Sequence, residues 1–260
     1  MGLLDIIEEI IDDDLLFILK YGLIISNFIT IFVLLYFKSK KQQDQKEVII
    51  DILEKENKSV LLVTAHPDDE AMFFLPTISY LQDNNYEIHL MCLSNGNANK
   101  IGKIRESELE KCCQYLKIKK LTIINDEDLQ DSMTATWPIE KIQKIVQKYI
   151  YENNIKGIIT FDKHGISGHL NHIACYNAIS TMKRTEDLKV FVLETTNIFR
   201  KYSSFLDFFV SSILNDNLMV NLNMLKAWKS MQIHHSQFVW YRKLFVVFSR
   251  YAYINTLIKI

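Results

Sequence analysis

The 260-residue chain has little glycine, proline or cysteine and almost no net charge. Seven glycines and three prolines leave loops built mainly from Asn, Asp and Lys, without repeats or low-complexity segments. The four cysteines show no CxxC spacing and indicate reduced thiols in a cytosolic setting. A net charge of −1 argues against nucleic acid as a partner, because such domains are usually basic. The absence of a GxGxxG or P-loop motif after any expected strand disfavours a nucleotide-binding regulator.

The first 58 residues divide into three segments by charge and hydropathy. An acidic segment at 1–14 precedes an apolar run from Leu15 to Phe37, in which Lys20 is the only charged residue. About 20 apolar residues in a helix span a hydrocarbon core that is roughly 30 Å thick. We therefore expect a transmembrane anchor at 15–37 and a polar linker at 38–58, with a buried amphipathic helix as the alternative.

The charges on either side of this run predict its orientation. Aspartates and glutamates precede it and lysines follow it, so the positive-inside rule places the carboxyl side in the cytoplasm. An acidic start and a run that ends in Tyr-Phe-Lys do not fit a cleaved signal peptide. The sequon at 57–59 is then expected to carry no glycan.

Residues 59–260 alternate short apolar runs with amphipathic stretches. Runs this short, rich in β-branched residues, predict buried strands, whereas apolar residues that recur at three and four predict helices. Strands joined by helices pair in parallel, so we expect a Rossmann-like, doubly wound α/β domain with a mostly parallel sheet. The expected strands are 59–64, 87–93, 121–124, 157–161 and 189–193, and the expected helices are 71–82, 103–116, 139–153 and 172–182.

Three acids and a histidine directly follow the first expected strand, in the string AHPDDE at 65–70. Sheets of this class bind ligands at the carboxyl ends of their strands. Pro67 fixes its own φ and favours extended backbone at His66, so His66 ends the strand while Asp69 begins the helix. Both side chains can then face one point. The simpler role of these acids, in the first turn of a helix, leaves His66 unexplained.

A second polar cluster follows the fourth expected strand, in the string HGISGHLNH at 164–172. Its two glycines permit a tight backbone path and its imidazoles include His169 and His172. An HxxD and an HxxH, each after a separate strand of one sheet, favour a metal site over structural histidines. Two histidines, a carboxylate and a water form the usual open catalytic zinc site. We therefore expect a hydrolase with Zn²⁺, although iron or cobalt suits the same ligands.

These motifs resemble those of the zinc de-N-acetylases that act on N-acetylglucosaminyl conjugates. Within that superfamily the chain resembles the eukaryotic N-acetylglucosaminyl-phosphatidylinositol (GlcNAc-PI) de-N-acetylases, or PIG-L family. The resemblance covers about 59 to the carboxyl end. It is carried by AHPDDEAMFF at 65–74, SNG at 94–96, RxxE at 105–108, GHxxH at 168–172, and the tail residues Met231, His234, Ser236, Gln237, Trp240, Arg242 and FSRY at 248–251.

The resemblance implies a reaction and a setting. GlcNAc-PI would be hydrolysed to glucosaminyl-phosphatidylinositol and acetate, a step of GPI-anchor biosynthesis at the endoplasmic reticulum membrane. The partners are then a glycolipid and the membrane, and the sequence names no protein partner. A deacetylase of a soluble amino-sugar conjugate and an inactive membrane adaptor are the alternatives.

The resemblance also implies roles for individual residues. The family's metal ligands fall on His66, Asp69 and His172, and its general base, which activates a zinc-bound water, falls on Asp68. His169 would then face the oxyanion of the transition state.

One position departs from many bacterial relatives. They have Pro-Asp where this chain has Leu170-Asn171, which leaves open whether His169 remains a cation. The eukaryotic branch is similar to this chain in having Asn, so we expect an active enzyme.

The loop at 94–104 is expected to cover the sugar, with Asn95, Gly96 and Arg105 in substrate binding. The Arg105 guanidinium suits the inositol phosphate, and the alternative is a pair with Glu108 or an aspartate that holds the loop. Other residues have two open interpretations. These are Asp126, Asp128 and Asp131 (sugar hydroxyls or a solvated loop), His234 and His235 (cleft or surface), and the aromatic and basic tail at 238–260 (membrane interface or domain core).

Overall fold

The computed structural model describes residues 58–214 and 218–260. The acidic segment, the anchor at 15–37 and all but the last residue of the linker lie outside the described residues. Within the described part, no helix is long and apolar enough to cross a membrane.

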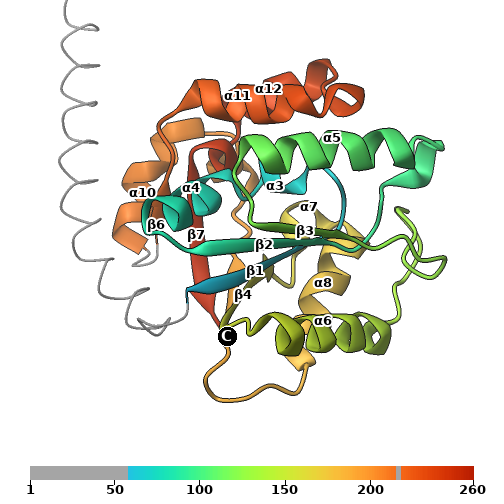
Figure 1. The fold of residues 1–260 in the computed structure, drawn as a ribbon. Coiled ribbons are helices and arrows are strands. Elements are labelled where there is room, and N and C mark those ends of the chain that lie inside the picture. The colour runs from blue at the N-terminus through green and yellow to red at the C-terminus, as the bar shows by residue number, and fades with distance from the viewer. Residues whose placement is uncertain (1–57, 215–217) are drawn as a thin grey trace, which may run out of the picture. The chain divides into compact units, whose positions relative to one another are not determined.

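A seven-stranded sheet of order β3-β2-β1-β4-β5-β7-β6 organises the described chain (Figure 1). The first five strands of this order are parallel, whereas β7 runs antiparallel to both β5 and β6. This confirms the expected mostly parallel α/β sheet. The strands are β1 (Ser59–Thr64), β2 (Glu87–Cys92), β3 (Lys120–Ile123), β4 (Gly157–Phe161), β5 (Lys189–Leu193), β6 (Leu218–Val220) and β7 (Ile254–Lys259).

Helices cover both faces of the sheet, which is why β1 and β4 are buried along their whole length. Figure 1 shows α4, α5 and α11 on one side and α6 and α8 on the other. Short helices and turns complete the carboxyl edge. The longer helices are α4 (Leu75–Asp83), α5 (Gly102–Tyr115), α6 (Ile139–Asn153), α8 (Leu170–Thr181), α10 (Asp207–Leu214), α11 (Met224–Ile233) and α12 (Trp240–Phe248); the short ones are α3 (Asp69–Met72), α7 (Gly165–Gly168) and α9 (Ile198–Lys201).

The single helix expected at 71–82 is instead two helices, α3 and α4, and that expectation was wrong. Pro76 has no N–H to continue the ladder from the preceding turn, so the helix restarts there. Asn255 of β7 fills the break. Its Nδ2 donates to the Phe73 carbonyl at 2.8 Å and its Oδ1 accepts from the Thr77 N–H at 3.1 Å.

The tail at 238–260 divides between the two interpretations of its sequence. β7 pairs with β5 and β6, and Ile254 and Leu257 are buried, so this half belongs to the domain core. In α12 only Val246 is buried, while Trp240 and other apolar side chains are exposed. The strand β6 was not predicted, whereas β7 is the last strand that the domain-core interpretation of the tail includes.

Phe161, at the end of β4, links the core to the candidate site, because its buried ring stacks on the His172 imidazole with centroids 4.0 Å apart. We expect Phe161→Ala to lower the free energy of unfolding by about 3–5 kcal/mol, through lost burial and a residual cavity. Chemical denaturation measures this. Tyr151→Ala on α6, where the side chain is 91% exposed, is the control and should change stability by less than about 0.5 kcal/mol. Equal effects in both variants would contradict this account.

Candidate active site

The polar motifs of the sequence meet at the carboxyl edge of the sheet, around a cavity of about 430 Å³. The lining of the cavity is partly polar and partly apolar. The polar lining comprises His66, Asp68, Asp69, Arg105, Asp131, Ser167, His169, His172 and Arg242, and the remaining lining comprises Met72, Phe73, Tyr202, Tyr241, Leu244, Phe245 and Phe248.

Asp69 locks the turn between β1 and α3. Its Oδ2 accepts the backbone N–H of Ala65 at 3.0 Å and that of His66 at 2.8 Å. Between them, Asp68 has φ 112°, a strained conformation for a residue with a side chain. The turn therefore directs two neighbouring acids into the site with different surroundings.

His66, Asp69 and His172 are all buried, and each offers one ligand atom within 4.8 Å of the others. The ring centroids of His66 and His172 are 5.4 Å apart. His172 directs Nδ1 at the Gly165 carbonyl, 3.0 Å away, which leaves Nε2 facing Asp69 Oδ1 at 3.3 Å. This buried Nε2 has no hydrogen-bond partner. An unpartnered imidazole nitrogen beside a carboxylate and a second imidazole fits a divalent metal such as Zn²⁺.

The ionisation of His66 and Asp69 also suits metal ligands, whereas at His172 burial lowers the pKa and Asp69 outweighs this and raises it. Burial lowers the pKa of His66 to about 4, against the opposing charges of Asp69 and Asp131, so its imidazole is neutral near pH 7. Burial alone would raise the pKa of Asp69, but His172 and His66 hold it well below its usual range. A neutral imidazole and an ionised carboxylate are the forms that bind metals.

Asp131 is a second carboxylate at His66, with Oδ1 at 3.3 Å from Nε2, and together with His169 these residues form another group with metal-ligand spacing. Asp131 also binds Arg105 Nη1 at 3.0 Å, so its charge is already paired. We therefore interpret Asp131 as the partner of His66 Nε2, the nitrogen that would not bind the metal. Such a partner orients a ligating imidazole and raises its basicity.

Asp68 lies between two guanidinium groups. Arg242 of α12 donates Nη1 to its Oδ2, and Arg105 Nη2 lies 3.4 Å from the same oxygen. The Asp68 N–H donates to Glu70 Oε2 at 3.2 Å, which supports the strained backbone. Burial raises the pKa of Asp68, and the two arginines oppose this rise.

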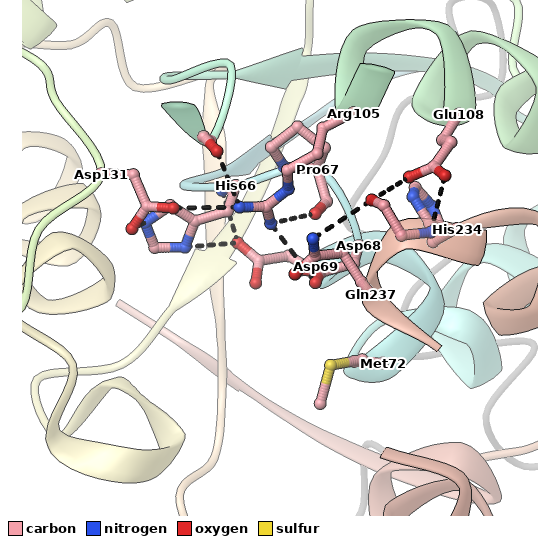
Figure 2. A network of polar contacts seen from close by, with 12 residues as sticks. His66, Pro67, Asp68, Asp69, Met72, Arg105, Glu108, Asp131, His234 and Gln237 are labelled. Atoms are coloured by element: carbon pink, nitrogen blue, oxygen red, sulfur yellow. Dashed lines mark hydrogen bonds and ion pairs between the residues drawn. The ribbon is translucent and has the colours of Figure 1, made fainter. Parts of the chain in front are cut away.

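Arg105 is a buried clamp at the centre of this network (Figure 2). Nη1 donates to the Gly96 carbonyl at 3.1 Å as well as to Asp131, and Nη2 donates to the Pro67 carbonyl at 2.7 Å. A Cβ on Gly96, which has φ +68°, would lie 2.4 Å from Arg105 Nη1. The structure therefore supports the alternative in which Arg105 holds the loop through an aspartate.

Asn95 and Gly96 lie behind Arg105 and do not line the cavity. The Asn95 amide instead donates to Glu106 Oε1 at 2.8 Å. Their part in substrate binding stays a prediction. Glu108 does not pair with Arg105, because it accepts two hydrogen bonds from Ser236, one from the N–H at 2.7 Å and one from Oγ at 2.6 Å.

His234 is neither in the cleft nor on the surface. It is fully buried, and its Nε2 lies 2.5 Å from Glu70 Oε1, while His235 is exposed. Cys112 completes a third group with metal-ligand spacing, but its burial raises the pKa of its thiol well above the usual value, which disfavours the thiolate that binds metals. Glu70 and His234 thus form a structural pair that reaches Asp68 through the Glu70 carboxylate.

Known proteins share both the sequence and the family motifs. A family model described as PIG-L, GlcNAc-PI de-N-acetylase, matches residues 61–183. A probable N-acetylglucosaminyl-phosphatidylinositol de-N-acetylase of Schizosaccharomyces pombe is 42% identical over 212 residues, which cover 76% of this chain and 86% of that protein. The N-acetylglucosaminyl-phosphatidylinositol de-N-acetylase of Bos taurus is 38% identical over 206 residues, which cover 76% and 81%. The chain belongs to this family.

The PIG-L fold extends to solved structures of low sequence identity. The N,N'-diacetylchitobiose deacetylase of Pyrococcus horikoshii, solved with its inhibitor MPG, matches with a TM-score of 0.58 at 17% identity. The match covers 84% of this chain and 91% of that chain. This likeness concerns the fold, whereas the two relatives above establish the PIG-L family.

The sequence motifs identified the residues of this PIG-L site that follow β1 and β4. They did not identify the residues that hold those groups in place, which are Arg242, His234 and Asp131. The contact between Arg242 and Asp68 spans 174 residues and that between His234 and Glu70 spans 164. Both tail residues stood in the family motif, but nothing in their spacing indicated a partner. Asp131 stood among three acids of one loop, and no local pattern distinguished it.

The buried pair of Glu70 and His234 should stabilise the PIG-L domain. We expect His234→Ala to lower the free energy of unfolding by about 3–5 kcal/mol, because it leaves the Glu70 carboxylate buried without its partner. Chemical denaturation measures the change. The exposed neighbour gives a matched control, His235→Ala, for which we expect less than about 0.5 kcal/mol. A small and similar change in both variants would contradict the pair's role.

The same pair predicts a pH dependence. Burial alone would lower the pKa of His234, but Glu70 raises it above its ordinary value of 6.5. A raised folded-state pKa contributes stability that is present below about pH 6.5 and lost as pH rises through the folded value. The difference in unfolding free energy between the unaltered protein and His234→Gln should therefore be largest in acid and shrink in alkali. A difference that grows with pH would exclude this assignment.

Proposed function

We propose that this protein hydrolyses the acetamide of GlcNAc-PI to give glucosaminyl-phosphatidylinositol and acetate, the reaction for which its family is named. The observation that carries the proposal is the buried group of two imidazoles and a carboxylate beside Asp68, in the lining of the cavity. The names of the two relatives favour a lipid-linked sugar over a soluble conjugate.

We assign His66, Asp69 and His172 as the ligands of one Zn²⁺ ion. When bound, such an ion acts as a Lewis acid and brings the pKa of water near neutrality. The protein's part is to hold the ligands. Phe161 fixes the His172 ring by stacking, and the Gly165 carbonyl fixes which of its nitrogens faces the site.

Asp68 is the proposed general base. Its carboxylate is adjacent in sequence to the ligand Asp69, and burial raises its pKa towards the range in which a base can both accept and return a proton. Arg242 and Arg105 hold one of its oxygens, so its orientation is fixed before substrate binds. Asp68 then accepts a proton from the attacking water and returns it to the leaving amine of the sugar.

His169 is the proposed hydrogen-bond donor to the oxyanion, and its surroundings favour the neutral imidazole. The Asn171 N–H donates to His169 Nδ1 at 3.2 Å, so in the neutral ring the proton lies on Nε2. Burial and the nearby His172 lower the pKa of His169. A neutral His169 can therefore donate through Nε2. The Asn171 side chain hydrogen-bonds to His66 and not to His169, since its Nδ2 lies 3.2 Å from His66 Nε2.

Two arginines border the space for the substrate. Arg105, whose guanidinium we expected at the inositol phosphate, is buried and has protein partners at both terminal nitrogens. Arg242 is less buried and lies at the side of the cavity formed by α12. We propose that Arg242 contributes the phosphate contact and that Arg105 mainly shapes the loop.

We further propose that residues 15–37 anchor the protein in the endoplasmic reticulum membrane as a single span, with the catalytic domain in the cytoplasm. Support comes from the apolar run, the acidic residues before it and the lysines after it. A membrane-resident substrate is consistent with such an anchor.

The proposed roles separate metal binding from proton transfer. We expect Asp68→Asn to keep its bound metal and to lose about 10²-fold to 10⁴-fold in turnover, because general-base catalysis contributes about that much. Acetate release from GlcNAc-PI and metal analysis of the same preparation measure both quantities.

The matched control is His172→Ala, which should lose metal and activity together, as should chelation of the unaltered protein. Deacetylation that resists a chelator would reject the metal. Loss of metal from Asp68→Asn would reject the division of roles.

The orientation predicts which end of the chain is accessible in sealed microsomes. We expect protease added outside to remove a carboxyl-terminal tag and to spare an amino-terminal one, with Asn57 free of glycan because it lies on the cytoplasmic side. Immunoblotting of both tags measures this. A glycosylated Asn57, or a protected carboxyl-terminal tag, would place the domain in the lumen instead.

A further inference from the structure

Helix α10 buries its charged residue and, apart from Phe208, exposes its apolar residues. Asp207 and Ser211, four residues apart, are buried, whereas Ile213 is 83% exposed and Leu214 is 64% exposed. Phe209 and Val210 are exposed on the same helix. A helix on a water-exposed surface normally shows the opposite arrangement.

Buried ion pairs fix this orientation. Asp207 accepts a hydrogen bond from Arg200 Nε at 2.7 Å, and its other oxygen lies 2.8 Å from the Nε of the fully buried Arg250. Ser211 Oγ donates a hydrogen bond to Asp207 Oδ2 and accepts hydrogen bonds from Arg200 Nη2 and Arg250 Nη2. If α10 rotated to bury its apolar side, Arg200 and Arg250 would lose Asp207 as their partner. The buried ion pairs therefore keep the apolar side exposed.

The apolar exposure continues onto the neighbouring elements. In α9 the Phe199 side chain is 86% exposed, and in α12 the Trp240 side chain is 72% exposed. Direct contacts join these parts. Ser204 Oγ, between α9 and α10, donates to the Val247 carbonyl of α12 at 3.0 Å. We call this surface the apolar rim, defined by Phe199, Phe209, Ile213, Leu214, Trp240, Leu244 and Phe248.

The apolar rim borders the cavity. Leu244 and Phe248 belong to both, and Tyr202, which follows α9, lies opposite Phe245 with ring centroids 6.4 Å apart. The apolar rim therefore adjoins the cavity at α12.

The charge of this part of the chain is strongly one-sided. From Thr195 to Ile260 the only acids are Asp207 and Asp216, and Asp207 is already paired internally. The same stretch contains eight basic residues, although the whole chain has a net charge of −1. They are Arg200, Lys201, Lys226, Lys229, Arg242, Lys243, Arg250 and Lys259, of which the three arginines pair with Asp207 or Asp68 and the five lysines have no acidic partner among the described residues of this stretch.

We propose that the apolar rim embeds in the surface of an anionic lipid bilayer, so that the cavity opens directly at the lipid headgroups. Apolar and aromatic side chains among basic residues are the composition that binds such interfaces. A second copy of this chain fits less well, because Asp207, the only acid of α9, α10 and α12, is already paired, which would leave the lysines of both copies without a partner. The advantage of this contact rests on the proposed function, because the GlcNAc headgroup could then reach Asp68 while its lipid stays in the bilayer.

Fluorescence at single positions tests this on the full-length chain in vesicles of phosphatidylcholine and phosphatidylinositol. All four native cysteines are buried, so a label attaches at an introduced Ile213→Cys on α10. The control is Tyr151→Cys, where the side chain is 91% exposed, against 83% at Ile213; its helix, α6, lies across the sheet from α12 (Figure 1). We expect nitroxide-bearing lipids to quench the label at 213 and aqueous iodide to quench the label at 151.

Two outcomes overturn the proposal. Equal quenching by iodide at both positions would show that the apolar rim faces water. Protection at 213 from both iodide and lipid nitroxide would show that a protein, such as a second copy, covers the rim. Neither outcome depends on deacetylase activity, so the proposed function can fail while the bilayer contact stands.

Turnover provides a second test. We expect the double variant Phe209→Ser, Ile213→Ser to act about tenfold more slowly on GlcNAc-PI in vesicles, because bilayer contact is weakened. The same variant should act normally on a water-soluble, short-chain GlcNAc-PI. An equal loss on both substrates would indicate damage to the fold and would contradict the proposal, whereas inactivity of the unaltered protein on both would reject the proposed function alone.

Discussion

The carboxylate of Asp69 is the interaction on which the site depends. One of its oxygens accepts two backbone N–H groups at the end of β1, and the other faces the His172 imidazole that arrives from α8. This single side chain therefore defines the turn after the first strand and connects it to the segment after the fourth. Because it is buried, its charge requires compensation, and the His/Asp/His arrangement supplies a place for a cation.

Residues from the last third of the chain hold the AHPDDE motif at 65–70 in place. Arg242 and His234 reach Asp68 and Glu70, the neighbours of Asp69 on either side, and Asn255 fills the helix break just beyond them. The site is thus supported by residues that also form the outer helices and the antiparallel strand. A change in α11 or α12 is therefore expected to affect Asp68 without touching the metal ligands.

The same region carries two kinds of surface. Its inner side is polar and paired with the catalytic motif, while its outer side exposes the apolar rim. This arrangement places the cavity between a buried charge network and a surface suited to lipid. The proposed reaction gives a physical reason for both features, since the lipid and the sugar of GlcNAc-PI require opposite environments.

The sequence by itself determined the parallel part of the sheet, because buried strands are local patterns, and it named the residues of the candidate metal site. His66, Asp69 and His172 were assigned through the family resemblance of the motifs that follow β1 and β4. Only the tertiary structure decided the partners of Asp68, the structural use of His234 and Arg105, and the exposure of α10. These depend on contacts between segments up to 174 residues apart, and on which side of a helix the buried ion pairs hold inward.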